Sequence, residues 1–116
     1  MVQPQAFLNG DFIPASAMQI PPTDAGFVLG VTVAEQLRTF RGELFRLEDH
    51  LSRLFHSLQL VGIQIEMDRR TMAATARELV AHNRALVDAE EDLGLSVFVT
   101  PGTYLTFALD GPVTPT

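Results

Sequence analysis

Apolar residues change their spacing twice along this 116-residue chain, and this change limits the folds that it can adopt. Between residues 31 and 40 they alternate with other residues, which is typical of a β-strand. They then recur at intervals of three and four residues, as on one face of a helix, at Leu47, Leu51, Leu54, Phe55, Leu58 and Val61. The β-like segments lie at both ends of the chain and the helical ones between them. This order predicts an α+β domain, in which two α-helices pack on one face of a largely antiparallel β-sheet.

Turn residues divide the β-like segments into pairs. Asn9-Gly10 stands between two short apolar stretches and predicts a type I′ hairpin. Gly42 predicts a second hairpin after the strand over residues 31–40. Residues 95–100 and 103–109 are rich in β-branched and aromatic side chains, so we expect a last pair of strands there.

Capping signals set the expected ends of the helices. Gly62 is suited to end the first helix, and Asp68 is an acceptable N-cap for the second. The second helix should end near Val87, because the acidic residues at 88–92 would lie at the negative end of its dipole. Before residue 31, Asp24-Ala25-Gly26 and Gly30 predict only a turn.

Composition excludes several classes of function. Fourteen acidic residues against eight basic ones give a net charge of -6, which disfavours binding to nucleic acid or to an anionic membrane. Cysteine is absent, and His56 and His82 lack the spacing of metal ligands, so no metal site is expected. No apolar run is long enough to span a bilayer, and a cytoplasmic location is favoured. All eight basic residues are arginines, so a Schiff base to lysine cannot form within this sequence.

The chain has the length of one domain. We assign residues 1–110 to a small α+β domain. Residues 111–116 contain two prolines and no apolar periodicity, and they are interpreted as the start of a linker that leads out of the domain.

Two groups of side chains are candidates for chemistry. On the first helix, His50, Arg53 and Ser57 share the face opposite the apolar stripe; this is either a solvated surface or a site that binds an anion such as phosphate. On the strand, Ala34, Gln36 and Arg38 share one side, which is either an exposed sheet face or a cleft wall that meets a substrate carboxylate.

Glu35 points to the other, apolar side of the same strand, with Val33 and Leu37. We interpret it as a hydrogen-bonded structural carboxylate, with a catalytic role as the less favoured alternative.

Four motifs occur in order: the Asn9-Gly10 hairpin, D-x-G-x-x-x-G at 24–30, E-x-x-R at 35–38 and H-x-x-R-L at 50–54. Together they resemble the N-terminal part of class IV aminotransferases, the fold-type IV pyridoxal-phosphate enzymes. That family includes branched-chain and D-amino-acid aminotransferases and aminodeoxychorismate lyase. The resemblance covers the family's small domain only.

The resemblance implies a role for each candidate. Arg53, with His50, would bind the phosphate of pyridoxal 5'-phosphate, while Ala34, Gln36 and Arg38 would line the substrate pocket, with Arg38 on the substrate carboxylate. An amino acid and a 2-oxo acid would be the substrates, and a homodimer the assembly. The family's catalytic lysine lies in its second domain, so we expect no catalytic residue in these 116 residues and no activity from them alone.

Departures from the family pattern bear on the substrate. Ala25 stands where an arginine is usual, and Ala34 where an aromatic residue is frequent. D-amino-acid aminotransferases carry an arginine and a histidine where this chain has Tyr104-Leu105-Thr106-Phe107, which disfavours a D-amino-acid substrate. A branched-chain substrate is favoured, because the strand offers few charged groups beyond Arg38. The alternatives are a lyase of the aminodeoxychorismate type and a non-catalytic interaction domain.

Overall fold

The computed structural model describes residues 3–104 and 113–116. Helices and strands follow in the order β1 (Gln5–Leu8), β2 (Asp11–Pro14), η1 (Ala15–Ala17), α1 (Ala25–Val28), β3 (Val33–Phe40), β4 (Glu43–Leu44), α2 (Leu47–Val61), α3 (Arg69–Arg84) and β5 (Gly94–Val99).

All the strand pairs are antiparallel among the described residues. β1 and β2 form a hairpin, and a three-stranded sheet has the order β4-β3-β5. Positive φ angles at Asn9 and Gly10 make the first turn, as the sequence predicts. In the larger sheet Val33 lies opposite Val99 and Arg38 opposite Gly94. This register pairs β3, which precedes the two long helices in the chain, with β5, which follows them.

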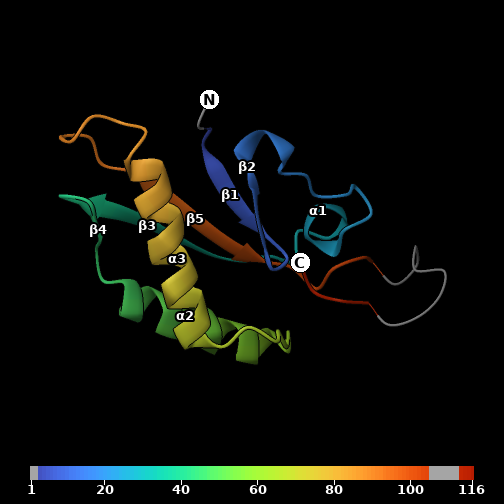
Figure 1. The fold of residues 1–116 in the computed structure, drawn as a ribbon. Helices are drawn as coiled ribbons and strands as arrows, with labels where there is room; N and C mark the ends of the chain where they lie inside the picture. The colour runs from blue at the N-terminus through green and yellow to red at the C-terminus, as the bar shows by residue number, and fades with distance from the viewer. Residues whose placement is uncertain (1–2, 105–112) are drawn as a thin grey trace.

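The core lies between this sheet and the two long helices (Figure 1). Residues of β3 alternate strictly between buried and exposed, which confirms the predicted division of its two faces. Leu51 and Leu54 of α2 are fully buried against the β3 face that carries Leu37. α3 packs against α2 and β1. The predicted α+β architecture, with helices on one face of an antiparallel sheet, is therefore confirmed.

Three local expectations were wrong. The segment expected to be a turn contains the one-turn helix α1, which Asp24 caps by accepting a hydrogen bond from the Gly26 amide at 2.7 Å. β3 begins at Val33, two residues later than expected. α3 ends at Arg84 instead of Val87. Past this end, the Arg84 guanidinium donates hydrogen bonds to the backbone oxygens of Asp88 and Ala89, which fold the chain back.

The last expected strand, 103–109, lies mostly outside the described residues. Its described part pairs with the segment before α1, because Thr103 forms a bridge with Asp24 and the Tyr104 amide donates to the oxygen of Thr23. Thr116 returns to the domain and pairs with Thr100.

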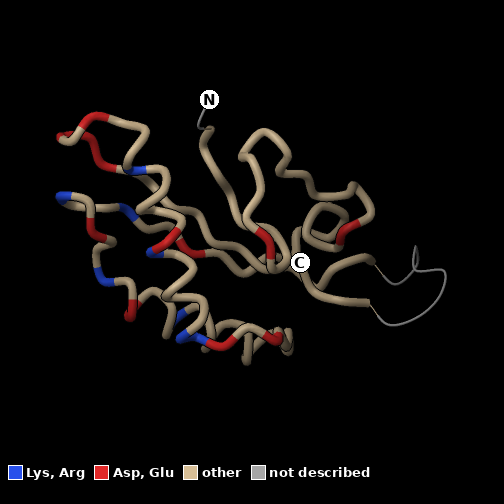
Figure 2. Tube along the Cα trace, viewed as in Figure 1, with Lys and Arg blue, Asp and Glu red and all other residues tan. Residues whose placement is uncertain are grey.

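Charged residues are unevenly distributed. Figure 2 marks acidic and basic residues along α2, α3 and the β3–β4 end, and few near the β1–β2 hairpin. No helix in the described part of the chain is long and apolar enough to cross a membrane.

Candidate functional site

Three side chains from β3 and α2 meet beneath the sheet. The Glu35 carboxylate accepts hydrogen bonds from Arg53 Nε at 2.8 Å and from Arg53 Nη2 at 2.7 Å. His50 Nδ1 lies 2.8 Å from Oε1 of the same carboxylate. His50 and Arg53 are three residues apart on α2, so both reach the same point of β3. The prediction that Glu35 is hydrogen-bonded is confirmed, while its structural role stays a prediction.

Burial differs sharply within this cluster. The Glu35 side chain is 5% exposed, whereas the Arg53 side chain is 67% exposed. Hydrogen bonds from Arg53 lower the pKa of Glu35 below its ordinary value, against the opposing effect of burial. The same pairing raises the pKa of Arg53. Glu35 is therefore ionised at neutral pH and holds one edge of the guanidinium.

The other edge of Arg53 fits an anion. Glu35 takes up Nε and Nη2, and no described residue accepts a hydrogen bond from Nη1. A guanidinium has five N–H donors in a fixed plane, so several remain for phosphate oxygens. The donor set thus fits the phosphate end of pyridoxal phosphate, although Glu35 offsets part of the positive charge.

Arg38 already has partners on the exposed face of β3. Its Nη2 lies 3.4 Å from Asp92 Oδ2, and its guanidinium carbon lies 4.1 Å from the centroid of the Phe40 ring. Asp92 is held in turn by the Thr39 hydroxyl at 2.8 Å. The cation is thus stacked on an aromatic ring beside a carboxylate.

The other two expected substrate residues share that face. Gln36 Oε1 accepts a hydrogen bond from the Ser96 hydroxyl at 2.8 Å, and Ala34 lies opposite Phe98. This face is opposite the one that carries Glu35. The structure therefore brings Arg53 and His50 together, and places Ala34, Gln36 and Arg38 on the other side of the same strand. Their roles in binding stay predictions.

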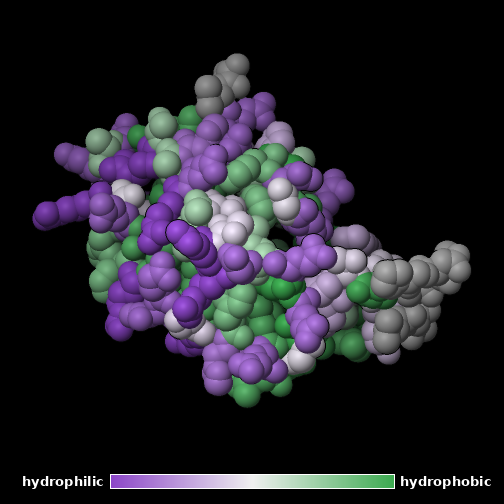
Figure 3. Space-filling model, turned by 60° about the horizontal axis from the view of Figure 1, so that its bottom comes forward, coloured by the Kyte–Doolittle hydropathy of each residue, from purple (hydrophilic) through white to green (hydrophobic). Residues whose placement is uncertain are grey.

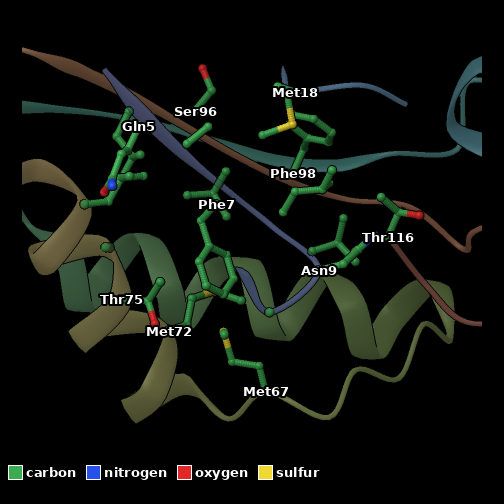
Figure 4. Close-up of a pocket in the computed structure, with 18 of the residues that line it drawn as sticks. Gln5, Phe7, Asn9, Met18, Met67, Met72, Thr75, Ser96, Phe98 and Thr116 are labelled. Atoms are coloured by element: carbon green, nitrogen blue, oxygen red, sulfur yellow. The ribbon is translucent and has the colours of Figure 1, made fainter. Parts of the chain in front are cut away.

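Sequence reasoning missed two features. In the sequence, Asp92 is one of several acidic residues at 88–92, and no spacing links it to Arg38 or Thr39. An apolar groove of about 1200 Å³, lined by residues of β1, α3 and β5 (Figure 4), also has no counterpart in any motif. As for metals, no group of three or more His, Asp or Glu side chains in residues 3–104 and 113–116 could hold an ion.

Comparison with known proteins agrees with the motifs. The family model described as amino-transferase class IV matches residues 32–112. A D-alanine aminotransferase of Staphylococcus aureus is 30% identical over 78 residues, which are 67% of this chain and 28% of that protein.

Solved structures share the fold. A fold IV transaminase from Curtobacterium pusillum superposes with a TM-score of 0.73 at 28% identity, over 80% of this chain and 32% of its own. A branched-chain aminotransferase from Thermoproteus uzoniensis, solved with norvaline, superposes with a TM-score of 0.76 at 22% identity, over 96% of this chain and 37% of its own. The chain thus spans about a third of the length of these relatives. It belongs to the class IV aminotransferase family.

Proposed function

We propose that this chain is the small domain of a pyridoxal-phosphate-dependent aminotransferase, which moves an amino group between an amino acid and a 2-oxo acid. The observation that carries the proposal is the family match over residues 32–112. Names of the similar proteins support it, since both D-alanine and branched-chain aminotransferases occur among them.

Arg53 and His50 would hold the cofactor phosphate. Glu35 fixes the plane of the Arg53 guanidinium, so its remaining N–H donors are already oriented. The Arg53 side chain would therefore lose little rotamer freedom when the phosphate binds. The cofactor, when bound, supplies the electron sink for the reaction. Because this sequence has no lysine, the amine that carries the cofactor would come from outside these residues.

The exposed face of β3 would meet the substrate. Arg38 would exchange Asp92 for the substrate carboxylate, with Gln36 and Ala34 beside it. Phe98 and Phe40 expose 41% and 47% of their surface on the same face, which favours an aliphatic, branched-chain side chain. D-alanine is the second candidate, because the curated relatives carry that name. We also propose a homodimer as the assembly.

Cofactor affinity tests the Arg53 assignment. In the full-length protein that contains this domain, Arg53→Ala should raise the dissociation constant of pyridoxal phosphate at least about tenfold, since charge-assisted hydrogen bonds to phosphate are lost. Titration of the cofactor's absorbance measures this. Arg46→Ala is the matched control, because Arg46 precedes the same helix and its exposed side chain pairs with the exposed Asp49. Equal dissociation constants of pyridoxal phosphate in the two variants would contradict the assignment of Arg53 to the cofactor phosphate.

Product analysis tests the reaction. The full-length protein should transfer the amino group of leucine or norvaline to 2-oxoglutarate faster than that of D-alanine. A preference for D-alanine would support the second candidate. Release of pyruvate from aminodeoxychorismate without amino transfer would favour the lyase. A protein that binds no pyridoxal phosphate and shows none of the three activities would favour an interaction domain.

A further inference from the structure

Hydrogen bonds to β3 fix the position of the Asp92 carboxylate beside the exposed face of that strand. The Thr39 amide donates to the Leu93 oxygen at 2.9 Å, and the Leu93 amide donates to the Thr39 hydroxyl at 2.9 Å. Because this hydroxyl accepts from Leu93, its own proton is left for Asp92 Oδ1, which lies 2.8 Å away. Thr39 is fully buried, so the anchor of Asp92 lies in the core.

Arg38 is held less firmly than its partner Asp92. The Arg38 side chain is 58% exposed, against 27% for Asp92, and the 3.4 Å between Nη2 and Oδ2 is long for a charge-assisted hydrogen bond. The hydrogen bond from Thr39 lowers the pKa of Asp92, against the opposing effect of burial, so the carboxylate is ionised at neutral pH. When Arg38 turns to another carboxylate, Asp92 therefore stays in place as a negative charge.

Other charges are absent from this face of the two strands. The exposed residues of β3 are Ala34, Gln36, Arg38 and Phe40, and those of β5 are Gly94, Ser96 and Phe98. Among these described residues Arg38 alone is charged, and Asp92 stands beside it. One carboxylate of a substrate can pair with Arg38. A second carboxylate finds no cation on β3 or β5 here and is repelled by Asp92.

We propose that Asp92 is a specificity-determining residue, which disfavours dicarboxylic substrates relative to monocarboxylic ones by keeping a negative charge beside Arg38. The substrates that fit are amino acids and 2-oxo acids with one carboxylate and an uncharged side chain. Branched-chain amino acids and D-alanine, the two candidates proposed above, both belong to this class. The inference rests on the proposed function, because it requires that Arg38 meets the substrate carboxylate.

The kcat/KM values for two amino acceptors test the proposal. The full-length protein that contains this domain is assayed, with pyridoxal phosphate bound, on 2-oxoglutarate and on 2-oxobutanoate. In Asp92→Asn the ratio of kcat/KM for 2-oxoglutarate to that for 2-oxobutanoate should rise at least about threefold, because the repulsion is lost while the shape of the side chain is kept. A loss of folded enzyme lowers both values equally and leaves their ratio unchanged.

Binding without reaction gives a second measurement. Succinate and butyrate differ in the same way as the two acceptors but carry no keto group. By calorimetry, the dissociation constant of succinate relative to that of butyrate should fall at least about threefold in Asp92→Asn. Raising the salt concentration from about 0.05 to 0.5 M should narrow the difference between wild type and variant, because salt screens the repulsion.

Two further variants separate the charge of Asp92 from its shape and its surroundings. Glu90→Gln is the matched control, since it removes one negative charge at an exposed site of the same acidic run. Its two ratios should equal those of wild type. Asp92→Glu keeps the charge, so both ratios should stay within about twofold of wild type.

The outcomes that contradict the inference differ from those that contradict the proposed function. Amino transfer with unchanged ratios in Asp92→Asn would overturn the inference alone. Equal rises in Asp92→Asn and Asp92→Glu would also overturn it, because shape would then set the ratio. If the wild type with bound cofactor transferred an amino group to neither 2-oxo acid, the proposed function would be contradicted and the inference would fall with it.

Discussion

Glu35 is a buried carboxylate on the core side of β3, and its hydrogen-bond partners make this burial possible. A buried carboxylate without partners is strongly unfavourable, and Arg53 and His50 supply three hydrogen-bonding contacts from α2. The arrangement fixes two things together: the rotation of α2 beneath the sheet and the direction of the Arg53 guanidinium. A phosphate-binding arginine would be pre-oriented by the same contact that holds helix to strand.

Replacement of Glu35 tests this double role. Glu35→Gln keeps the shape of the side chain and removes its charge, so it should lower the free energy of unfolding by about 1–3 kcal/mol at neutral pH. Urea unfolding measures the loss. Glu43→Gln, the same change at an exposed site on β4, should cost less than about 0.5 kcal/mol. Equal effects of the two changes would mean that the Glu35 cluster contributes no stability.

Acid should weaken the fold through the same carboxylate. The folded pKa of Glu35 lies below its ordinary value of 4.5, chiefly because Arg53 donates hydrogen bonds to it. Its contribution is therefore complete above the unfolded pKa and is lost as the pH falls through the folded pKa. Urea unfolding at about pH 7, 5 and 3 should show a steeper loss of stability below about pH 5 in the wild type than in Glu35→Gln. Parallel curves would contradict the pairing.

Among the elements, the β3–β4 turn shows how a backbone requirement and a side-chain contact can coincide. Arg41 and Gly42 both have positive φ, and a Cβ on Gly42 would lie 3.0 Å from Arg84 Nε. Arg84 also holds the backbone after α3. The turn, the end of α3 and the following loop thus meet at one guanidinium.

A pair of glycine substitutions separates the two effects. Gly10→Ala and Gly42→Ala impose similar strain, since φ is +95° and +84°, and each should cost about 1–2 kcal/mol through the backbone. Only Gly42→Ala also displaces Arg84, because nothing lies within 4 Å of a Cβ at Gly10. We expect the larger loss of unfolding free energy at Gly42. If Gly10→Ala costs as much, the contact with Arg84 adds nothing.

Periodicity predicted the elements that bury a regular face. The alternation in β3 and the leucine stripe of α2 follow from the need to cover one side of a strand and one side of a helix. The sequence did not predict α1, because a single helical turn is too short to show a helical period. The sequence did not predict the end of α3 at Arg84. The Arg84 side chain donates hydrogen bonds to the backbone oxygens of Asp88 and Ala89, and this contact depends on the path of the chain after the helix.

The candidate site was only partly predictable. Motif spacing selected Arg53 and His50, and the strand alternation placed Glu35 on the apolar side. Their meeting depends on the packing of α2 beneath β3, which no local spacing specifies. Asp92 reaches Arg38 across 54 residues, and nothing in the acidic run distinguishes it from its neighbours.

At the scale of the whole molecule, the chain is less compact than its length allows. Its radius of gyration is 15.2 Å, against about 13 Å for a compact domain of this size. Large apolar side chains also lie on its surface. Figure 3 shows apolar surface among hydrophilic residues on one face. Phe27 and Leu60 are 74% and 73% exposed. Surfaces of this kind are typical of sites that another molecule covers.

We therefore expect the isolated chain to associate with itself through apolar contacts. Sedimentation velocity at rising concentration should show a larger species in the wild type and less of it in Leu60→Ser, with Tm unchanged because Leu60 is exposed. Gln59→Ser, its exposed neighbour on α2, is the control and should behave as wild type. Added salt should strengthen association, since it screens the repulsion between chains of net charge -6 without weakening apolar contacts. Association that weakens with salt would instead point to ion pairs between copies.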